Sequence, residues 1–215
     1  REIMLFLRKG ALYLGGMIIL TLGQRLFVEA GFGADALDAL CVGLSESAGL
    51  TPGTWVAVTA LLMMCTAAVL SGRKPLTGGL VSSFIFGVFF DLWARFFQRF
   101  YEPGSVGIRI LMYGAGILLG PLGTAVYFKS GFAKSALDDF IFAIKDRLHL
   151  SIRVTKTAVE IGLCTLAFLF GGPIGIATVI TAVLYGPLLQ GFMNRLDNMC
   201  TICVRSGIHG FVKKI

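Results

Sequence analysis

The chain has 215 residues, of which 56% are hydrophobic and 14% are charged, and its mean hydropathy is +0.82. Soluble domains carry about 25% charged residues, so this composition excludes an ordinary soluble globule, a disordered chain and a small disulfide-stapled secreted domain. The formal net charge is +7, but the basic residues flank apolar runs, which is typical of membrane topology and excludes a nucleic-acid partner. The chain is therefore predicted to be an all-α polytopic membrane protein.

Six apolar stretches are long enough to cross about 30 Å of hydrocarbon as helices. They are expected at about 4–28, 53–72, 76–97, 107–128, 154–171 and 173–193. Two further segments, 34–48 and 135–148, have helical patterning but carry charge, and their length corresponds to a rise of only about 21 Å. These two are predicted to be interfacial or re-entrant half-helices.

The two halves of the chain match each other at a spacing of about 100 residues. The matches include Tyr13 with Tyr113, Gly16 with Gly116, Gly31–Asp38 with Gly131–Asp138 and, after a one-residue gap, Gly87 with Gly186. The expected division is residues 1–103 for the first repeat, 104–198 for the second and 199–215 for a cytoplasmic tail. Each half has three long spans and one half-helix.

Three crossings per repeat place the second copy upside down in the membrane, which is the plan of many secondary transporters. If the half-helices also crossed, each repeat would have four crossings and the repeats would run parallel. The positions of Lys and Arg fit both topologies. The shortness of the half-helices favours six crossings, with both termini in the cytoplasm.

The paired Gly-Phe-x-x-x-Ala-Leu-Asp segments resemble the glycine-rich turn and Asp-bearing helix of the YczE/YitT-like bacterial membrane proteins. The closing span, Gly175–Leu188, resembles the same family. Pro-Trp-Asp is common in that family where this chain has Ala36-Leu37-Asp38 and Ala136-Leu137-Asp138. The resemblance implies a transporter-like integral protein of the bacterial inner membrane, and it implies no particular substrate.

Two aspartates are the first candidates for a functional role. Asp38 and Asp138 lie in the first turns of the half-helices, and a carboxylate inside the bilayer usually faces a cavity and binds a proton, a cation or an amine. Ser135-x-x-Asp138 also has capping-box spacing, and Asp35-x-x-Asp38 imitates it. Capping of a helix N-terminus and ion or substrate binding are both open interpretations of these four residues.

Three polar residues lie together near the end of the first span. Arg25 and Glu29 are spaced to form an i,i+4 ion pair, and Gln24 stands beside them. Lys129 matches Glu29 in the second repeat, so the two charges are expected at opposite mouths of an inverted pair. Interfacial anchoring and a gating role are the alternatives for Arg25, Glu29 and Lys129.

Two more polar residues are candidates for binding a substrate or ion. Glu160 is spaced to pair with Lys156 and lies deeper in its expected span, and Gln190 matches Asp91 of the first repeat. Glycines throughout the spans are expected to allow close contact between helices; those singled out are Gly15, Gly16, Gly78, Gly79, Gly87, Gly114, Gly116, Gly120, Gly175 and Gly186.

The leading functional hypothesis is secondary transport, in the direction of export, of a small or amphipathic organic molecule, with proton coupling through Asp38 and Asp138. The alternatives are a substrate-capture subunit of a multi-component importer and a non-transporting scaffold or lipid-handling protein. No enzyme motif is present, and Cys200-x-x-Cys203 alone is a weak metal or redox signal, so no enzyme activity, cofactor or metal is expected. Expected partners are membrane lipids and a small-molecule or ion substrate, with homodimerisation left open.

Overall fold

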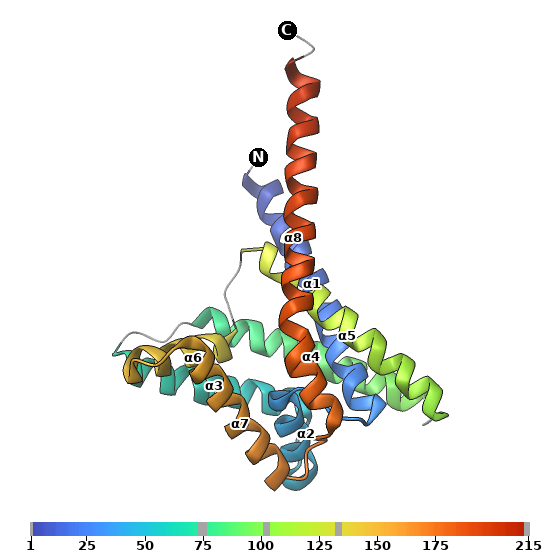
Figure 1. Cartoon of the computed structure of the whole chain (residues 1–215), viewed down its shortest axis with the longest axis vertical. Coiled ribbons are helices and arrows are strands. Elements are labelled where there is room, and N and C mark those ends of the chain that lie inside the picture. Colours follow the sequence, from blue (N-terminus) through green and yellow to red (C-terminus); the bar gives the residue numbers. More distant parts are fainter. Residues whose placement is uncertain (1, 73–76, 101–103, 132–134, 213–215) are drawn as a thin grey trace.

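The computed structural model describes the backbone of residues 2–72, 77–100, 104–131 and 135–212, and the side chains of these residues except 2–6, 8, 77, 138, 152–153 and 197–212. Within this part the chain forms helices and no strands (Figure 1). The helices are α1 (Glu2–Ala30), α2 (Ala36–Ala48), α3 (Pro52–Ser71), α4 (Thr77–Phe100), α5 (Val106–Lys129), α6 (Ala136–Leu148), α7 (Ile152–Leu169) and α8 (Ile176–Val212).

Five of these helices contain a stretch that is long and apolar enough to cross a membrane. The stretches are Lys9–Ala30, Pro52–Ser71, Gly78–Phe100, Val106–Lys129 and Ile176–Leu196, which agree with five of the six expected spans. The sixth expected span, 154–171, forms α7 but is not in this set. The first half of α7 contains three charged residues, Arg153, Lys156 and Glu160. The chain is an all-helical polytopic membrane protein, as predicted, and α2 and α6 are the two expected short helices.

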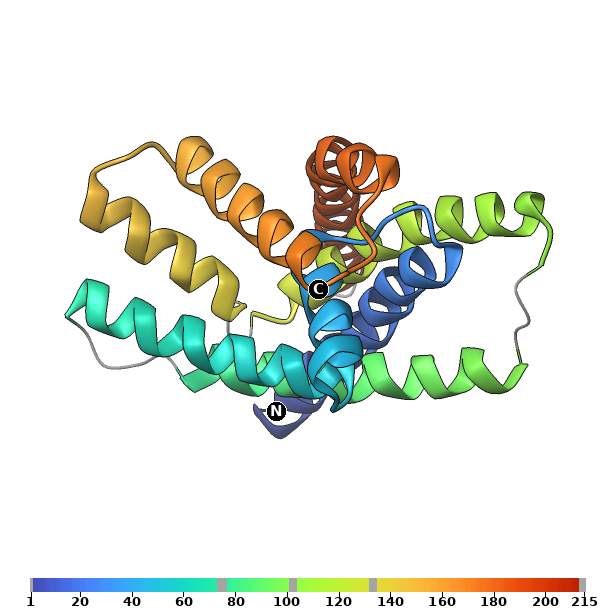
Figure 2. The same ribbon diagram turned by 90° about the horizontal axis from the view of Figure 1, so that it is seen from below.

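The long helices α1 and α5 lie side by side and run in opposite directions (Figures 1 and 2). Gly16 of α1 faces Tyr127 of α5, and Gly23 of α1 faces Gly120. A Cβ atom on Gly16 would lie 2.5 Å from the backbone nitrogen of Tyr127, so only glycine allows this approach. The glycines form an antiparallel seam that joins the two halves of the chain.

Aromatic rings close the seam near both of its ends. The rings of Tyr13 and Tyr127 have centroids 5.4 Å apart, and those of Phe27 and Tyr113 are also 5.4 Å apart. In each pair one ring comes from α1 and the other from α5. Contacts of this geometry add to the hydrophobic packing of the two helices.

At each end of the seam, a tyrosine hydroxyl forms a hydrogen bond to a further helix. Tyr13 Oη donates to Ser82 Oγ of α4 at 2.9 Å. Tyr113 Oη lies 2.9 Å from Thr181 Oγ1 of α8 and also donates to the carbonyl of Ala177 at 2.8 Å. Helices α4 and α8 therefore occupy corresponding positions on α1 and α5.

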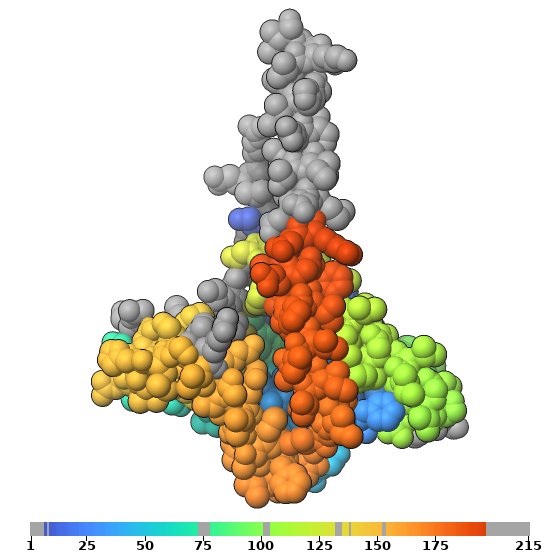
Figure 3. Space-filling view, in the orientation of Figure 1, coloured from blue at the N-terminus to red at the C-terminus, as the bar shows by residue number. Residues whose placement is uncertain are grey.

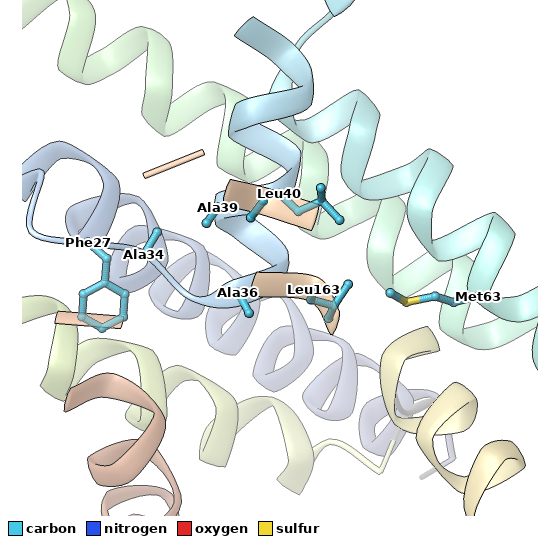
Figure 4. Close-up of a cluster of buried hydrophobic side chains, with 8 residues drawn as sticks. Phe27, Ala34, Ala36, Ala39, Leu40, Met63 and Leu163 are labelled. Carbon is cyan, nitrogen blue, oxygen red and sulfur yellow. The ribbon is translucent and has the colours of Figure 1, made fainter. Parts of the chain in front are cut away.

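The short helices lie between the longer ones, with α2 packed against α3 and α7, and α6 against the same two helices. Helix α2 contributes most to a cluster of buried side chains that also receives residues from α1, α3 and α7 (Figure 4). Its buried members are Phe27, Ala34, Ala36, Ala39, Leu40, Met63, Leu163 and Ala167. The predominance of alanine lets the backbones approach closely around the start of α2.

Helices α3 and α4 meet at a second glycine contact, and substitution of its glycine tests how closely the two helices pack. A Cβ atom on Gly53 would collide with the carbonyl of Gly87 and lie 2.7 Å from the carboxylate carbon of Asp91. Gly53→Ala is expected to destabilise the protein by about 1–3 kcal/mol through overpacking. The same change at Gly114, whose Cβ position has no neighbour within 4 Å, is expected to stabilise α5 by about 0.5–1 kcal/mol. Apparent Tm in detergent measures both, and a rise for Gly53→Ala would contradict this packing.

Candidate functional site

The start of α2 is held by the turn between α7 and α8. Gly33, with φ of 128°, packs so closely on Gly175 that no side chain fits between them. Ala34 N donates to the carbonyl of Pro173 at 2.9 Å, and Ala177 N donates to the carbonyl of Phe32 at 3.2 Å. The two turns fix the N-terminal end of α2 at the boundary between the halves of the chain.

Asp38 lies in the first turn of α2 and is buried, with 4% of its surface exposed. Its Oδ2 atom has no hydrogen-bond partner within the described residues. Asp35 occupies the N-cap position but makes no side-chain capping bond, so the capping interpretation is not supported for Asp35. The corresponding Ser135 does cap α6, since its hydroxyl accepts from Leu137 N at 3.2 Å.

A buried cation stands near Asp38. Arg25 is 8% exposed, donates from Nε to Glu29 Oε1 at 2.7 Å, and lies 5.6 Å from the centre of the Phe90 ring. The expected i,i+4 pair is confirmed, and its arginine is buried against α4. Burial raises the pKa of Asp38 well above its usual range, the charge of Asp35 raises it further, and Arg25 opposes both.

Asp35 also interacts with charged side chains of α7. Burial raises the pKa of Asp35, the Glu160 carboxylate raises it further, and Lys156 acts in the opposite direction. Lys156 Nζ and Glu160 Oε1 are 3.7 Å apart, so the predicted spacing of this pair is confirmed. The site thus combines carboxylates from α2 and α7.

The remaining predicted site residues are dispersed. Gln24 is buried beside Arg25, and its Oε1 has no hydrogen-bond partner in the described part of the chain. Gln190 is exposed on α8, so its expected place in the site is not supported. Lys129 is half-buried in the last turn of α5, and the antiparallel seam puts it and Glu29 near opposite ends, as expected. Asp138 belongs to α6, but its side chain lies outside the described residues.

Two polar contacts near the site were not anticipated from the sequence. Tyr185 Oη of α8 lies 2.6 Å from Thr124 Oγ1 of α5. Arg109 Nε donates to the carbonyl of Ala30 at 2.7 Å, and its guanidinium lies 5.0 Å from the centre of the Phe32 ring. A cation at a helix C-terminus is favourable, but nothing in the sequence pairs Arg109 with the end of α1.

The comparisons with known proteins place the chain in a family. A model described as a family of unknown function, DUF6198, matches residues 7–194. The chain belongs to this family. It is 38% identical over 179 residues to the uncharacterized protein YyaS of Bacillus subtilis, covering 83% of this chain and 89% of YyaS.

Two further relatives cover similar shares of the chain. The uncharacterized membrane protein YczE of Bacillus subtilis is 28% identical over 83% of this chain and 82% of its own length. An uncharacterized protein of Haemophilus influenzae is 30% identical over 86% of this chain and 83% of its own length. The resemblance to YczE is confirmed and supports a membrane location, and no solved structure matches the chain.

Proposed function

We propose that this chain is a secondary transporter of the bacterial inner membrane, built from two inverted repeats of three crossings and one short helix each. It carries a small or amphipathic organic molecule outward and is coupled to protons through Asp38 and Asp138. Both termini lie in the cytoplasm. No enzyme activity belongs to this function.

The contacts of the α1–α5 seam support the inverted repeat. At a spacing of 100 residues, Tyr13 corresponds to Tyr113 and Tyr127 corresponds to Phe27. The contact between Tyr13 and Tyr127 therefore has its counterpart in the contact between Tyr113 and Phe27, and the two pairs of rings have the same centroid distance. A twofold axis between antiparallel helices has this effect, and inverted-topology repeats are related by such an axis in the membrane plane.

The ends of the chain support an even number of crossings. The first turns of α1 and the C-terminal half of α8 lie at the same end of the molecule (Figure 1). Five crossings would put these ends on opposite sides of the membrane, whereas six put them on one side. Helix α7 is therefore counted as the sixth crossing in this proposal, and its charged first half faces the pathway.

The buried carboxylate of Asp38 carries the proposal. A charge removed from water is costly unless it is paired and hydrogen-bonded, yet Asp38 Oδ2 has no partner in the described part of the protein. It also lies on α2 between Ala36 and Ala39, two members of the buried cluster. Intramembrane carboxylates in such positions mark ion and substrate pathways, including proton relays.

Proteoliposomes test this function directly. The purified protein is reconstituted with the pH dye pyranine inside the vesicles, and ethidium, choline or salicylate is added outside under an imposed pH gradient. Wild-type protein is expected to move protons in response to at least one solute. The double variant Asp38→Asn with Asp138→Asn is expected to lose this response while remaining folded.

The matched control is Glu46→Gln, which removes one negative charge from the exposed part of the same helix α2. It is expected to keep the wild-type response. Wild-type flux in the double variant, or no solute-dependent flux from the wild-type protein, would overturn the proposed function. Movement of labelled lipid between the two leaflets of vesicles that contain the protein but no added solute, without solute-dependent proton movement, would favour the lipid-handling alternative.

A further inference from the structure

The two halves of the structure differ in how their last two helices meet. In the first half, Gly53 N of α3 donates to Asp91 Oδ1 of α4 at 2.8 Å, beside the close contact with Gly87. At a spacing of 99 residues the counterparts of Gly87 and Asp91 are Gly186 and Gln190 on α8. Both are exposed, and the Cβ position of Gly186 has no neighbour within 4 Å. Helices α3 and α4 are thus in contact at this point, whereas α7 and α8 are apart at the corresponding one.

The separation of α7 and α8 leaves a cleft on the surface. Figure 3 shows the cleft between orange α7 and red α8, with atoms of earlier, blue and teal segments visible at its floor. The turn that joins α7 to α8 contacts the start of α2. The cleft therefore leads from the outside of the molecule toward the end of α2 that carries Asp35 and Asp38.

The described charges along this route are predominantly acidic. Asp35, Asp38 and Glu160 interact electrostatically with one another or with a shared neighbour. The cations that act on them are Arg25, which is already bonded to Glu29, and Lys156, which is 3.7 Å from Glu160. Counting Glu29 and also Arg109 at the end of α1, four carboxylates face three cations. The net charge of this region is negative, which attracts a positive ligand.

The buried atoms without partners indicate which kind of positive ligand fits. Asp38 Oδ2 is a hydrogen-bond acceptor, and Gln24 Oε1 of α1 is a second buried acceptor without a partner in the described part of the chain. An ammonium group supplies up to three N–H donors, and the alanine-rich cluster around α2 suits an apolar carbon skeleton. Within the described residues no three His, Cys, Asp or Glu side chains converge as metal ligands, which favours an organic cation over a metal ion.

We propose that the cleft between α7 and α8 admits organic ammonium ions, whose charged group binds at Asp38 with Asp35 beside it. This inference rests on the proposed transport function and names its substrate class. In the structure α3 and α4 are in contact at Gly53 and Gly87, whereas the corresponding part of α8 has no such contact.

Equilibrium binding to the purified protein in detergent tests the ligand class. Benzylamine, benzyl alcohol and benzoate share one ring and differ in charge, and calorimetric titration at pH 8 compares them. Benzylamine is expected to bind at least about tenfold more tightly than the other two compounds. Neither benzyl alcohol nor benzoate can form an ion pair with a buried carboxylate. Equal affinities, or no binding of benzylamine, would overturn the inference.

Three variants assign that binding to the aspartates. Asp38→Asn is expected to weaken benzylamine binding at least about tenfold, and Asp35→Asn to weaken it less, because Asp38 holds the unpartnered oxygen. Glu46→Gln is expected to bind as the wild type does. If Asp38→Asn is folded by size-exclusion chromatography and circular dichroism and binds benzylamine with unchanged affinity, the site is elsewhere.

The entrance is tested separately. Gly186→Trp adds a bulky side chain on α8 where the structure has open space, and it is expected to slow benzylamine association at least about fivefold by narrowing the cleft. Gly114→Trp, at an equally open position on α5, is the control and is expected to leave the rate unchanged. Equal rates for all three proteins would rule out this route.

The outcomes separate the inference from the function on which it rests. Binding of benzylamine without flux of any solute in proteoliposomes would remove the transport function and leave an ammonium-binding membrane protein. Flux of salicylate that does not depend on Asp38, with no benzylamine binding, would remove the ammonium inference and leave a transporter of another substrate class.

Discussion

Gly23→Leu is expected to prevent assembly of the two halves and to leave little monodisperse protein after extraction from the membrane. A Cβ atom at this position would overlap the backbone of Gly120, and one at Gly116 would lie 2.9 Å from the carbonyl of Gly23. Backbone atoms of two packed helices cannot turn aside as a flexible side chain can. Overpacking of a core costs typically about 1–3 kcal/mol and occasionally more, and a leucine wedged between two backbones belongs at the upper end.

The same helix offers a matched control. Gly15 lies eight residues earlier on α1, and its Cβ position has no neighbour within 4 Å. Gly15→Leu is therefore expected to retain the wild-type elution profile and yield. Fluorescence-detected size-exclusion chromatography of both variants makes the comparison, and a normal monodisperse peak for Gly23→Leu would mean that α1 and α5 are not joined by this seam.

The glycines also show how far the sequence predicts the packing. Their density indicates close helix contacts, and Gly16, Gly87 and Gly116 indeed face a neighbouring backbone, whereas Gly15 and Gly186 face open space. Because these helices are apolar on nearly all sides, the period of the hydrophobic residues does not reveal which face is inward. The length and order of the helices could be predicted, but the assignment of faces required tertiary contacts.

The short helices show the same limit at the candidate site. Ser135 and Asp35 both occupy an N-cap position, yet only Ser135 makes a side-chain capping bond. The spacing alone suggests capping for both, and it cannot show that the turn at Gly33 is locked against Gly175. The burial of Asp38 follows from that tertiary contact, so the sequence predicts the residue and leaves its environment undetermined.

Replacement of the buried aspartate is expected to stabilise the protein while removing its function. Asp38→Asn keeps the size of the side chain and removes a charge from a position that is 4% exposed and has an unbonded oxygen. An unsatisfied buried group costs about 1–3 kcal/mol, and more when it is charged. The apparent Tm of Asp38→Asn in detergent at pH 8 is therefore expected to exceed that of the wild type, whereas Glu46→Gln, on the exposed part of α2, is expected to leave it unchanged.

The pH dependence of this gain distinguishes a buried charge from a change in packing. The folded-state pKa of Asp38 is raised well above the usual value of 3.8, first by burial and then by Asp35. The folded protein therefore binds this proton more tightly than the unfolded chain, so the stabilisation is full below about pH 4 and is lost as the pH rises through the folded pKa. As the pH is raised from about 4 to 8, the Tm of the wild type is expected to fall more steeply than that of Asp38→Asn, with the two curves converging toward acid pH. Parallel curves would show that the folded and unfolded chains bind the same number of protons at this residue across the range. The pKa of Asp38 would then not be raised by folding, which would contradict a buried proton-binding carboxyl group. Diverging curves together with lost flux would mean that the protein retains a destabilising charge because its activity requires it, as expected where stability and function oppose each other at one residue.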